Sequence, residues 1–211
     1  MTILNIKPFI FPEVKIVQYQ RYQDERGYFT EVYNMQAFSE NNELSSIFSD
    51  GKIAQVNESS SKKGVIRGMH AQWEPPLGKL IRTIAGHMVD LVIDLRLNSP
   101  TFGKMAAYDM PADLSNPIGE MIWIPFGFGH GNYYLEPSKI EYFCTAHWNP
   151  QGEVSISPIA TDIDWTLCDD RLKNEFDQLT QAQSLLITDK DRDGLSIAAW
   201  KDSEMAKNHF S

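Results

Sequence analysis

Cysteine is scarce in this chain of 211 residues, with Cys144 and Cys168 its only two. Two cysteines in apolar or β-rich surroundings provide neither a disulfide framework nor the clustered spacing of a structural zinc site. The chain also lacks a run of about 18 apolar residues, the minimum that crosses a bilayer as a helix. Its first residues lack the basic start and continuous apolar stretch of a secretory signal, so we expect a cytoplasmic protein.

Positive charge is also in short supply. Lys and Arg number 19 against 28 Asp and Glu, which gives a formal net charge of −9 at pH 7. Nucleic acids and anionic membranes bind cationic surfaces, so this charge argues against both as partners. A small anionic ligand in a local basic pocket remains compatible with it.

Turn-forming segments divide the middle of the chain into short runs with β-strand character. Residues 87–95 alternate apolar side chains with Asp90 and Asp94, which predicts a half-buried strand. Residues 121–125 and 139–148 predict further strands. Short strands separated by turns favour a sandwich or barrel over alternating βα units, so we expect a mainly β jelly-roll core.

The last third of the chain has spaced apolar residues among many helix formers. Residues 169–186 and 197–210 are predicted as helices or covering segments. The length suits a single domain. We expect one domain over residues 1–211, with N-terminal strands in 1–60, a jelly-roll core at about 61–165 and a cover of short C-terminal helices at about 166–211.

Polar and ionisable residues concentrate in the β region. His70 and Gln72 share a strand face, and Lys79 follows within a few residues. Tyr142 and Trp148 share another face, which would point inward in a barrel. A lone strand histidine is more often structural than catalytic, and such aromatics more often belong to a core. These residues alone therefore predict a β-barrel with a candidate polar pocket.

Several motifs occur in an order that resembles one family. The central ones are Gly64-Val-Ile-Arg-Gly-Met-His-Ala-Gln72, Gly78-Lys-Leu-Ile-Arg82 and Trp123-Ile-Pro-Phe-Gly-Phe-Gly-His-Gly131. Others lie at 24–31, 55–57, 90–103, 141–153 and 188–191. Together they resemble the dTDP-4-dehydrorhamnose 3,5-epimerase family, whose fold is a cupin-like double-stranded β-helix.

The resemblance implies epimerisation at C3, C5 or both of a nucleotide-linked 4-keto-6-deoxy sugar such as dTDP-4-dehydro-6-deoxyglucose, with no cofactor. His70 matches the family's base, and Asp191 matches the carboxylate paired with it. Lys79 matches the cation that faces the developing O4 enolate. Tyr142 matches the acid that returns a proton from the opposite face.

The resemblance also implies binding positions. Arg26 and Arg67 suit phosphate, because a guanidinium group offers a bidentate fork. Trp148 stands where the family stacks a Tyr on the nucleobase. The other matching positions are Glu31, Gln55, Asn57, His130, Glu153 and Lys190. A homodimer with exchanged N-terminal strands is implied as well, in which Arg26 serves the partner's site.

A catalytic metal is not expected. Jelly rolls of the cupin type often bind metal through two histidines one residue apart, a following Glu and a distant His. Here Gln72 takes the second position, and Glu74 lies too close to replace it. Neutral amides are poor ligands for transition metals compared with imidazole.

The match departs from the family at positions that the resemblance places near the ligand. Ala71 and Asn132 stand where aromatic residues are common, and Phe143 replaces a Lys. Val56 replaces an Asp, and Trp148 replaces a Tyr. The nucleotide and the sugar therefore stay open, including purine-linked and heptose substrates.

Three functions follow as hypotheses. An epimerase predicts that solvent deuterium enters C3 or C5. A 3,4-ketoisomerase on the same substrates also needs a base, although the presence of Tyr142 and Asp191 favours epimerisation. A non-catalytic nucleotide-sugar-binding cupin would bind without exchange and would tolerate the loss of His70 or Tyr142.

Overall fold

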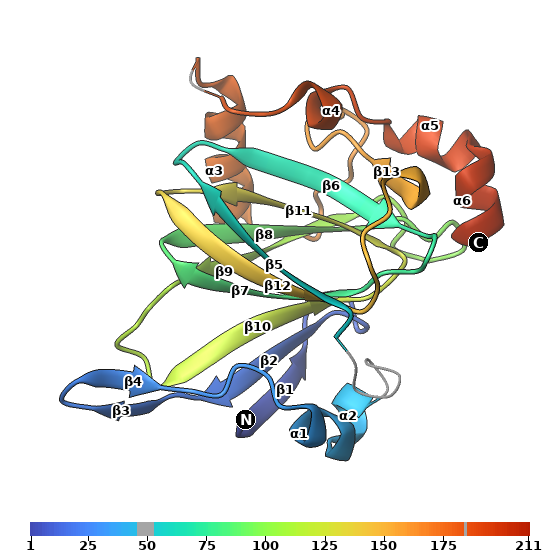
Figure 1. The fold of residues 1–211 in the computed structure, drawn as a ribbon. Helices are drawn as coiled ribbons and strands as arrows, with labels where there is room; N and C mark the ends of the chain where they lie inside the picture. The colour runs from blue at the N-terminus through green and yellow to red at the C-terminus, as the bar shows by residue number, and fades with distance from the viewer. Residues whose placement is uncertain (46–52, 184) are drawn as a thin grey trace.

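Two facing antiparallel β-sheets form the body of the protein, in a computed structural model that describes residues 1–45, 53–183 and 185–211 (Figure 1). One sheet has the strand order β1 (Ile3–Pro8), β2 (Lys15–Gln20), β10 (Ile118–Ile124), β7 (Lys79–Ala85), β12 (Ser138–Cys144) and β5 (Gln55–Ser61). The other has the order β13 (Glu153–Ser155), β6 (Ile66–Gln72), β11 (Phe128–Tyr134), β8 (His87–Asp94) and β9 (Met105–Pro111). Because the chain passes back and forth between the two sheets from β5 to β13, the fold is a jelly roll, which confirms the predicted class.

The strand that the sequence predicts as half-buried is buried on both faces. Val89 of β8 packs with residues of the C-terminal helices, whereas Val92 packs between the two sheets. Asp90 and Asp94 are fully buried as well. The prediction for this strand is wrong because helices cover the sheet face that a bare two-layer sandwich would leave to solvent.

Short helices cover the outer face of the five-stranded sheet. They are α3 (Asp170–Gln181), α4 (Asp189–Arg192), α5 (Ile197–Asp202) and α6 (Glu204–His209). The segment predicted at 197–210 is split at Ser203, whose amide closes α5 and whose hydroxyl caps α6. Trp200 is fully buried beneath this cover and donates its indole N–H to the Leu95 carbonyl at 3.0 Å. The helical trim is therefore confirmed, with shorter elements than the pattern predicts.

The strand predicted at 139–148 ends at Cys144. In the sheet, Cys144 pairs with Lys79 on one side and Gln55 on the other, and these are the first residues of β7 and β5. No partner strand continues beyond them within the described residues. Trp148 therefore lies in the loop after β12 and not on the strand face that the alternation predicts.

The N-terminal elements lie at the opposite side of the molecule from the C-terminal helices. Helices α1 (Met35–Glu40) and α2 (Asn42–Ser45) pack on the outer face of the six-stranded sheet. The hairpin of β3 (Tyr22–Asp24) and β4 (Gly27–Phe29) extends clear of both sheets (Figure 1). Residues 46–52 of the predicted N-terminal segment lie outside the described residues.

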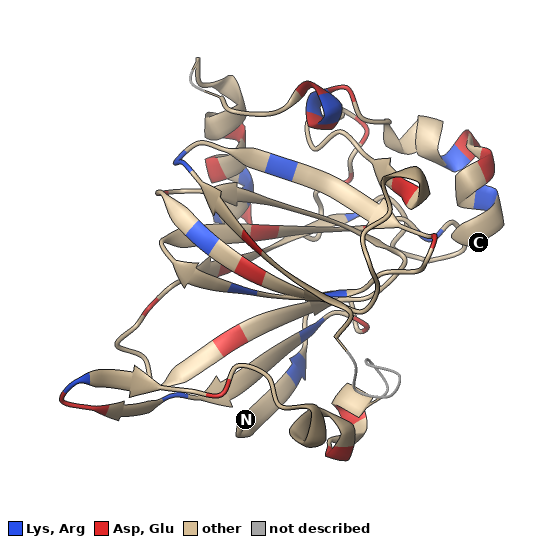
Figure 2. Ribbon diagram, in the orientation of Figure 1, with Lys and Arg blue, Asp and Glu red and all other residues tan. Residues whose placement is uncertain are grey.

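Charge is distributed in small groups over this fold. Acidic and basic residues interleave on the C-terminal helices and at the hairpin, and neither sign forms a continuous face in this view (Figure 2). No helix among the described residues is long and apolar enough to cross a membrane.

Candidate active site

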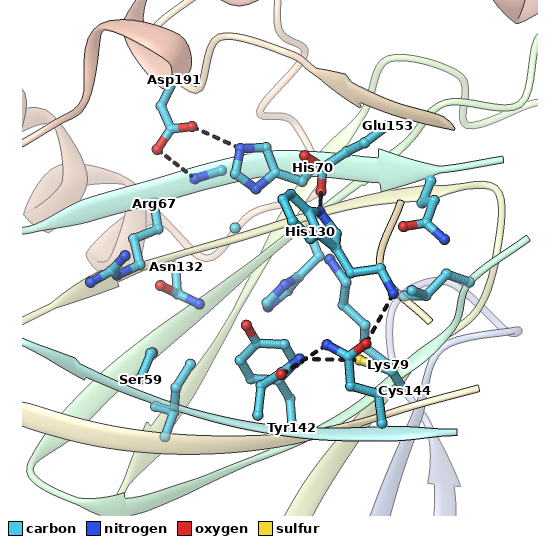
Figure 3. Close-up of a pocket in the computed structure, with 18 of the residues that line it drawn as sticks. Ser59, Arg67, His70, Lys79, His130, Asn132, Tyr142, Cys144, Glu153 and Asp191 are labelled. Carbon is cyan, nitrogen blue, oxygen red and sulfur yellow. Dashed lines mark hydrogen bonds and ion pairs between the residues drawn. The ribbon is translucent and has the colours of Figure 1, made fainter. Parts of the chain in front are cut away.

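A cavity of about 430 Å³ lies between the two sheets. β6 and β11 supply one wall, and β5, β7 and β12 supply the facing wall (Figure 3). The loop after β12, the start of β13 and helix α4 complete its rim. The structure brings together here most of the residues predicted from the sequence: Gln55, Asn57, Arg67, His70, Lys79, His130, Tyr142, Trp148, Glu153, Lys190 and Asp191.

Arg26 and Glu31 are the two predicted residues that do not line the cavity of their own chain. Arg26 follows β3 at the turn of the hairpin, is highly exposed and pairs with Asp24 at 2.6 Å. Glu31 pairs with the N-terminal ammonium group of Met1. The single chain therefore brings neither of these residues to the cavity.

Two glycines shape the wall around His70. Gly68 has a φ of +100°, and a Cβ there would lie 2.5 Å from the Cα of Gly131. A side chain is therefore excluded at this crossing of β6 and β11. The register of the two strands also shifts between His130 and Asn132. This irregularity lets Arg67 and His70 face the same cavity although they are three positions apart.

His70 and Asp191 form a pair at the edge of the cavity. The Nε2 of His70 lies 2.7 Å from Oδ1 of Asp191, and the Gly68 amide donates to Oδ2 at 3.4 Å. Burial acts to raise the pKa of Asp191, but the hydrogen bond and charge of His70 outweigh it, with help from Thr188 and Gly68, and the pKa is lowered. An ionised Asp191 keeps a proton on Nε2. The second ring nitrogen, which faces the cavity in Figure 3, is then able to accept a proton.

Lys79 and Tyr142 come from the opposite sheet. Within the described part of the chain, the Lys79 ammonium group makes no hydrogen bond or ion pair. Its burial lowers the pKa of Lys79, an effect that Cys144 and Glu153 oppose. Burial also raises the pKa of Tyr142, so its phenol keeps its proton at neutral pH. The cavity thus holds a proton acceptor on one wall and a proton donor with a cation on the other.

His130 has a buried partner that the sequence analysis missed. Its Nε2 lies 2.8 Å from Oδ2 of Asp90. Burial lowers the pKa of His130 and raises that of Asp90, so both shifts favour a pair that shares one proton and carries no net charge. The alternation of β8 assigned Asp90 to the solvent face, but Asp90 lies on the same strand face as Val92, which packs between the two sheets. Among the described residues, no three or more His, Cys, Asp or Glu side chains gather as a metal site.

The rim carries an exposed aromatic ring and a carboxylate. The indole of Trp148 is 56% exposed and donates to Oε1 of Glu153 at 3.3 Å. The other oxygen of Glu153 pairs with Lys190 at 2.6 Å. Gln55 fixes the loop, because its Oε1 accepts the Trp148 amide at 3.0 Å. This rim presents a flat ring beside hydrogen-bonding groups, which suits a nucleobase.

Fold and cavity together define a class: a cupin-like jelly roll with a cavity lined by ionisable residues between its two sheets. Comparison with known proteins narrows it. A family model described as dTDP-4-dehydrorhamnose 3,5-epimerase matches residues 9–199. The chain belongs to the dTDP-4-dehydrorhamnose 3,5-epimerase family, as its motifs predict.

Individual relatives agree with this assignment. A protein of Methanothermobacter thermautotrophicus named dTDP-4-dehydrorhamnose 3,5-epimerase is 36% identical over 180 residues, which cover 84% of this chain and 85% of that protein. One of Neisseria gonorrhoeae with the same name is 38% identical over 151 residues, which cover 71% of this chain but 43% of that protein. The structure of dTDP-6-deoxy-D-glucose-3,5-epimerase from Legionella pneumophila, in complex with dTDP-4-keto-L-rhamnose, is 30% identical with a TM-score of 0.73. That similarity covers 92% of this chain and 93% of the Legionella chain.

Proposed function

We propose that this protein epimerises a nucleotide-linked 4-keto-6-deoxy sugar at C3, C5 or both, without a cofactor. One observation carries the proposal: His70 and Tyr142 come from facing sheets and line the same cavity. Inversion requires a proton to leave one face of the sugar and another to arrive on the opposite face. A base and an acid on opposite walls meet this requirement, whereas one base alone would restore the starting configuration.

The residues suit each step. The 4-keto group acidifies the hydrogens on C3 and C5, and His70 takes one of them through the ring nitrogen that faces the cavity. Asp191 stabilises the resulting imidazolium at 2.7 Å. Negative charge then develops on O4, where the ammonium group of Lys79 would stabilise it. Tyr142 gives its phenolic proton to the opposite face, and solvent afterwards reprotonates Tyr142 and deprotonates His70.

The rim supports a nucleoside diphosphate as the rest of the substrate. The exposed ring of Trp148 offers a stacking surface for a base. Arg67 and Lys190 line the same cavity and supply charge for the diphosphate. The relative from Legionella pneumophila was solved with dTDP-4-keto-L-rhamnose, so thymidine diphosphate sugars are the first substrates to test.

We further propose a cytoplasmic homodimer in which the N-terminal strands of the single domain are exchanged. The hairpin of β3 and β4 stands clear of its own sheets, and Phe29, the last residue of β4, is 69% exposed. Exchange would cover this ring and carry Arg26 toward the partner's cavity. Sedimentation velocity should give a dimer at micromolar concentration, and a monomeric species would contradict the arrangement.

Proton exchange in heavy water tests the catalytic proposal. Thymidine, guanosine and cytidine diphosphate 4-ketosugars would be followed by NMR, and deuterium should enter C3, C5 or both. His70→Ala should abolish exchange, while His209→Ala, which changes an exposed histidine, serves as the matched control. Tyr142→Phe should retain exchange on the His70 face but yield no inverted product.

Each other outcome favours another function. Absence of exchange on every ketosugar would overturn the proposal, and tight binding without exchange would indicate a sugar-binding protein. Movement of the carbonyl from C4 to C3 in the product would instead identify a ketoisomerase.

A further inference from the structure

Gln72 is a buried amide beside the cavity, and the steps above leave it without a role. It is the last residue of β6, two positions after His70, and only 3% of it is exposed. It stands where a metal-binding jelly roll would have its second histidine. Burying an amide is costly unless its nitrogen and oxygen are hydrogen-bonded, so the partners of Gln72 show what it does.

The side chain of Gln72 joins two loops. Its Nε2 donates to the Pro75 carbonyl and to the His147 carbonyl, both at 2.9 Å. Its Oε1 accepts the main-chain amide of Asn149 at 2.8 Å. An amide nitrogen has two hydrogens, so none remains for a ligand. Gln72 is therefore unable to donate to a substrate, and it acts on the site through the loops that it holds.

These hydrogen bonds fix the main chain on both sides of Trp148. His147 and Asn149 are its neighbours in the sequence, and the amide of Trp148 itself is held by Gln55 at 3.0 Å. The indole ring is 56% exposed, and its nitrogen donates to Glu153 at 3.3 Å. Because more than half of the ring lies in solvent, its direction depends on the main chain that carries it.

We propose that Gln72 is a positioning residue that holds Trp148 ready to stack on the nucleobase of the substrate. The inference rests on the proposed function, since it takes the Trp148 ring as the surface for the base. A ring that is already in place loses little freedom when the ligand binds, so less of the binding energy is spent on ordering it. Gln72 gives no group to the reacting carbons, so its effect belongs to substrate binding and not to proton transfer.

The first test compares KM with kcat. Gln72→Met keeps the length of the side chain and removes all three hydrogen bonds. Because the freed loop must then be ordered by the ligand, KM for the ketosugar should rise about 3- to 10-fold, with kcat within about twofold of the wild type. Gln178→Met makes the same change at an exposed glutamine of α3 and should leave both constants unchanged. A lower kcat at unchanged KM in Gln72→Met would overturn the inference.

A double-mutant cycle separates positioning of Trp148 from a general role in the fold. Calorimetry would give Kd for thymidine diphosphate, or for guanosine or cytidine diphosphate if proton exchange identifies that nucleotide. Gln72→Met should raise Kd about 3- to 10-fold in the wild-type background. In a Trp148→Ala background, where no ring remains to be positioned, it should change Kd by less than about twofold. An equal rise in both backgrounds would overturn the inference.

Gln72→Asn provides a second variant in case Gln72→Met does not fold. Its amide is one methylene shorter, too short to keep all three hydrogen bonds, so the same rise in Kd and the same loss of effect in Trp148→Ala are expected. Failure of both variants to fold would show that the amide serves the fold, and would overturn the inference. Absence of wild-type proton exchange on every ketosugar would instead overturn the proposed function.

Discussion

Replacement of Asp191 by asparagine should impair the base more than the loss of one charge implies. Asp191 accepts from His70 at one oxygen and from the Gly68 amide at the other. Asparagine has one accepting oxygen, and the main-chain amide of Gly68 can only donate. The asparagine oxygen would therefore face Gly68, and its NH₂ group would face Nε2 of His70. Nε2 must then lose its proton, which moves to the nitrogen that faces the cavity and blocks it as a base.

General-base catalysis contributes about 10²- to 10⁴-fold, so kcat for epimerisation should fall by that factor in Asp191→Asn. KM should stay within about threefold, because the change removes no substrate contact. Proton exchange at pH 7, followed by NMR, measures both constants. Asp191→Ala leaves both tautomers of His70 accessible and should retain more activity than Asp191→Asn. The reasoning fails if asparagine is the more active variant or remains within about tenfold of the wild type.

Three further predictions concern charge and stacking. Lys79→Met should lower kcat about 10²- to 10³-fold. Burial lowers the pKa of Lys79, so the same variant should have a higher Tm at pH 7. This gain in Tm should shrink as pH rises toward about 10.4, the pKa of a lysine in the unfolded chain. A lower Tm of Lys79→Met would contradict this reasoning. Asp94→Asn should cost about 3 kcal/mol of unfolding free energy in urea. Burial acts to raise the pKa of Asp94, but its hydrogen bonds, Arg96 first among them, hold it below the ordinary value. The wild-type advantage should therefore be complete above about pH 4 and fade as pH falls through the lowered pKa; an advantage that does not change with pH would contradict this cause. Trp148→Ala should raise KM about tenfold with little change in kcat, and an unchanged KM would remove this ring from the base site.

The sequence predicted the sheets more accurately than their surroundings. Turn residues and alternation placed strands at 87–95 and 139–148, because these are local signals. Burial depends on what lies against a strand, and helices from the last third of the chain cover β8. The alternation past Cys144 failed for a similar reason, since β5 and β7 supply no partner beyond that point. Tertiary contacts therefore decided where local patterns stopped applying.

The cavity residues also divide into those that a local pattern predicts and those that only tertiary contacts bring together. Alternation alone placed Tyr142 on an inward-pointing strand face, and Tyr142 lines the cavity. The contact of His70 with Asp191 joins residues 121 positions apart, and no local pattern contains it. It was expected only through the resemblance to a family. Asp90 was missed because an acidic residue in an alternating strand normally faces solvent, and its partner lies on another strand.

A buried polar group outside the cavity, Asp94, is paired and stabilises the fold, whereas a buried polar group inside it, Lys79, lowers the stability of the unliganded protein. Asp94 is fully buried, but Arg96, Ser99 and Thr101 all donate to it, so it holds a loop in place. Lys79 lacks such partners among the described residues, and its burial disfavours the charged ammonium group, which lowers the stability of the unliganded protein. Selection for stability alone would replace Lys79 with an apolar residue. Its presence is consistent with a ligand that brings an anionic oxygen to Lys79, as an enolised ketosugar would.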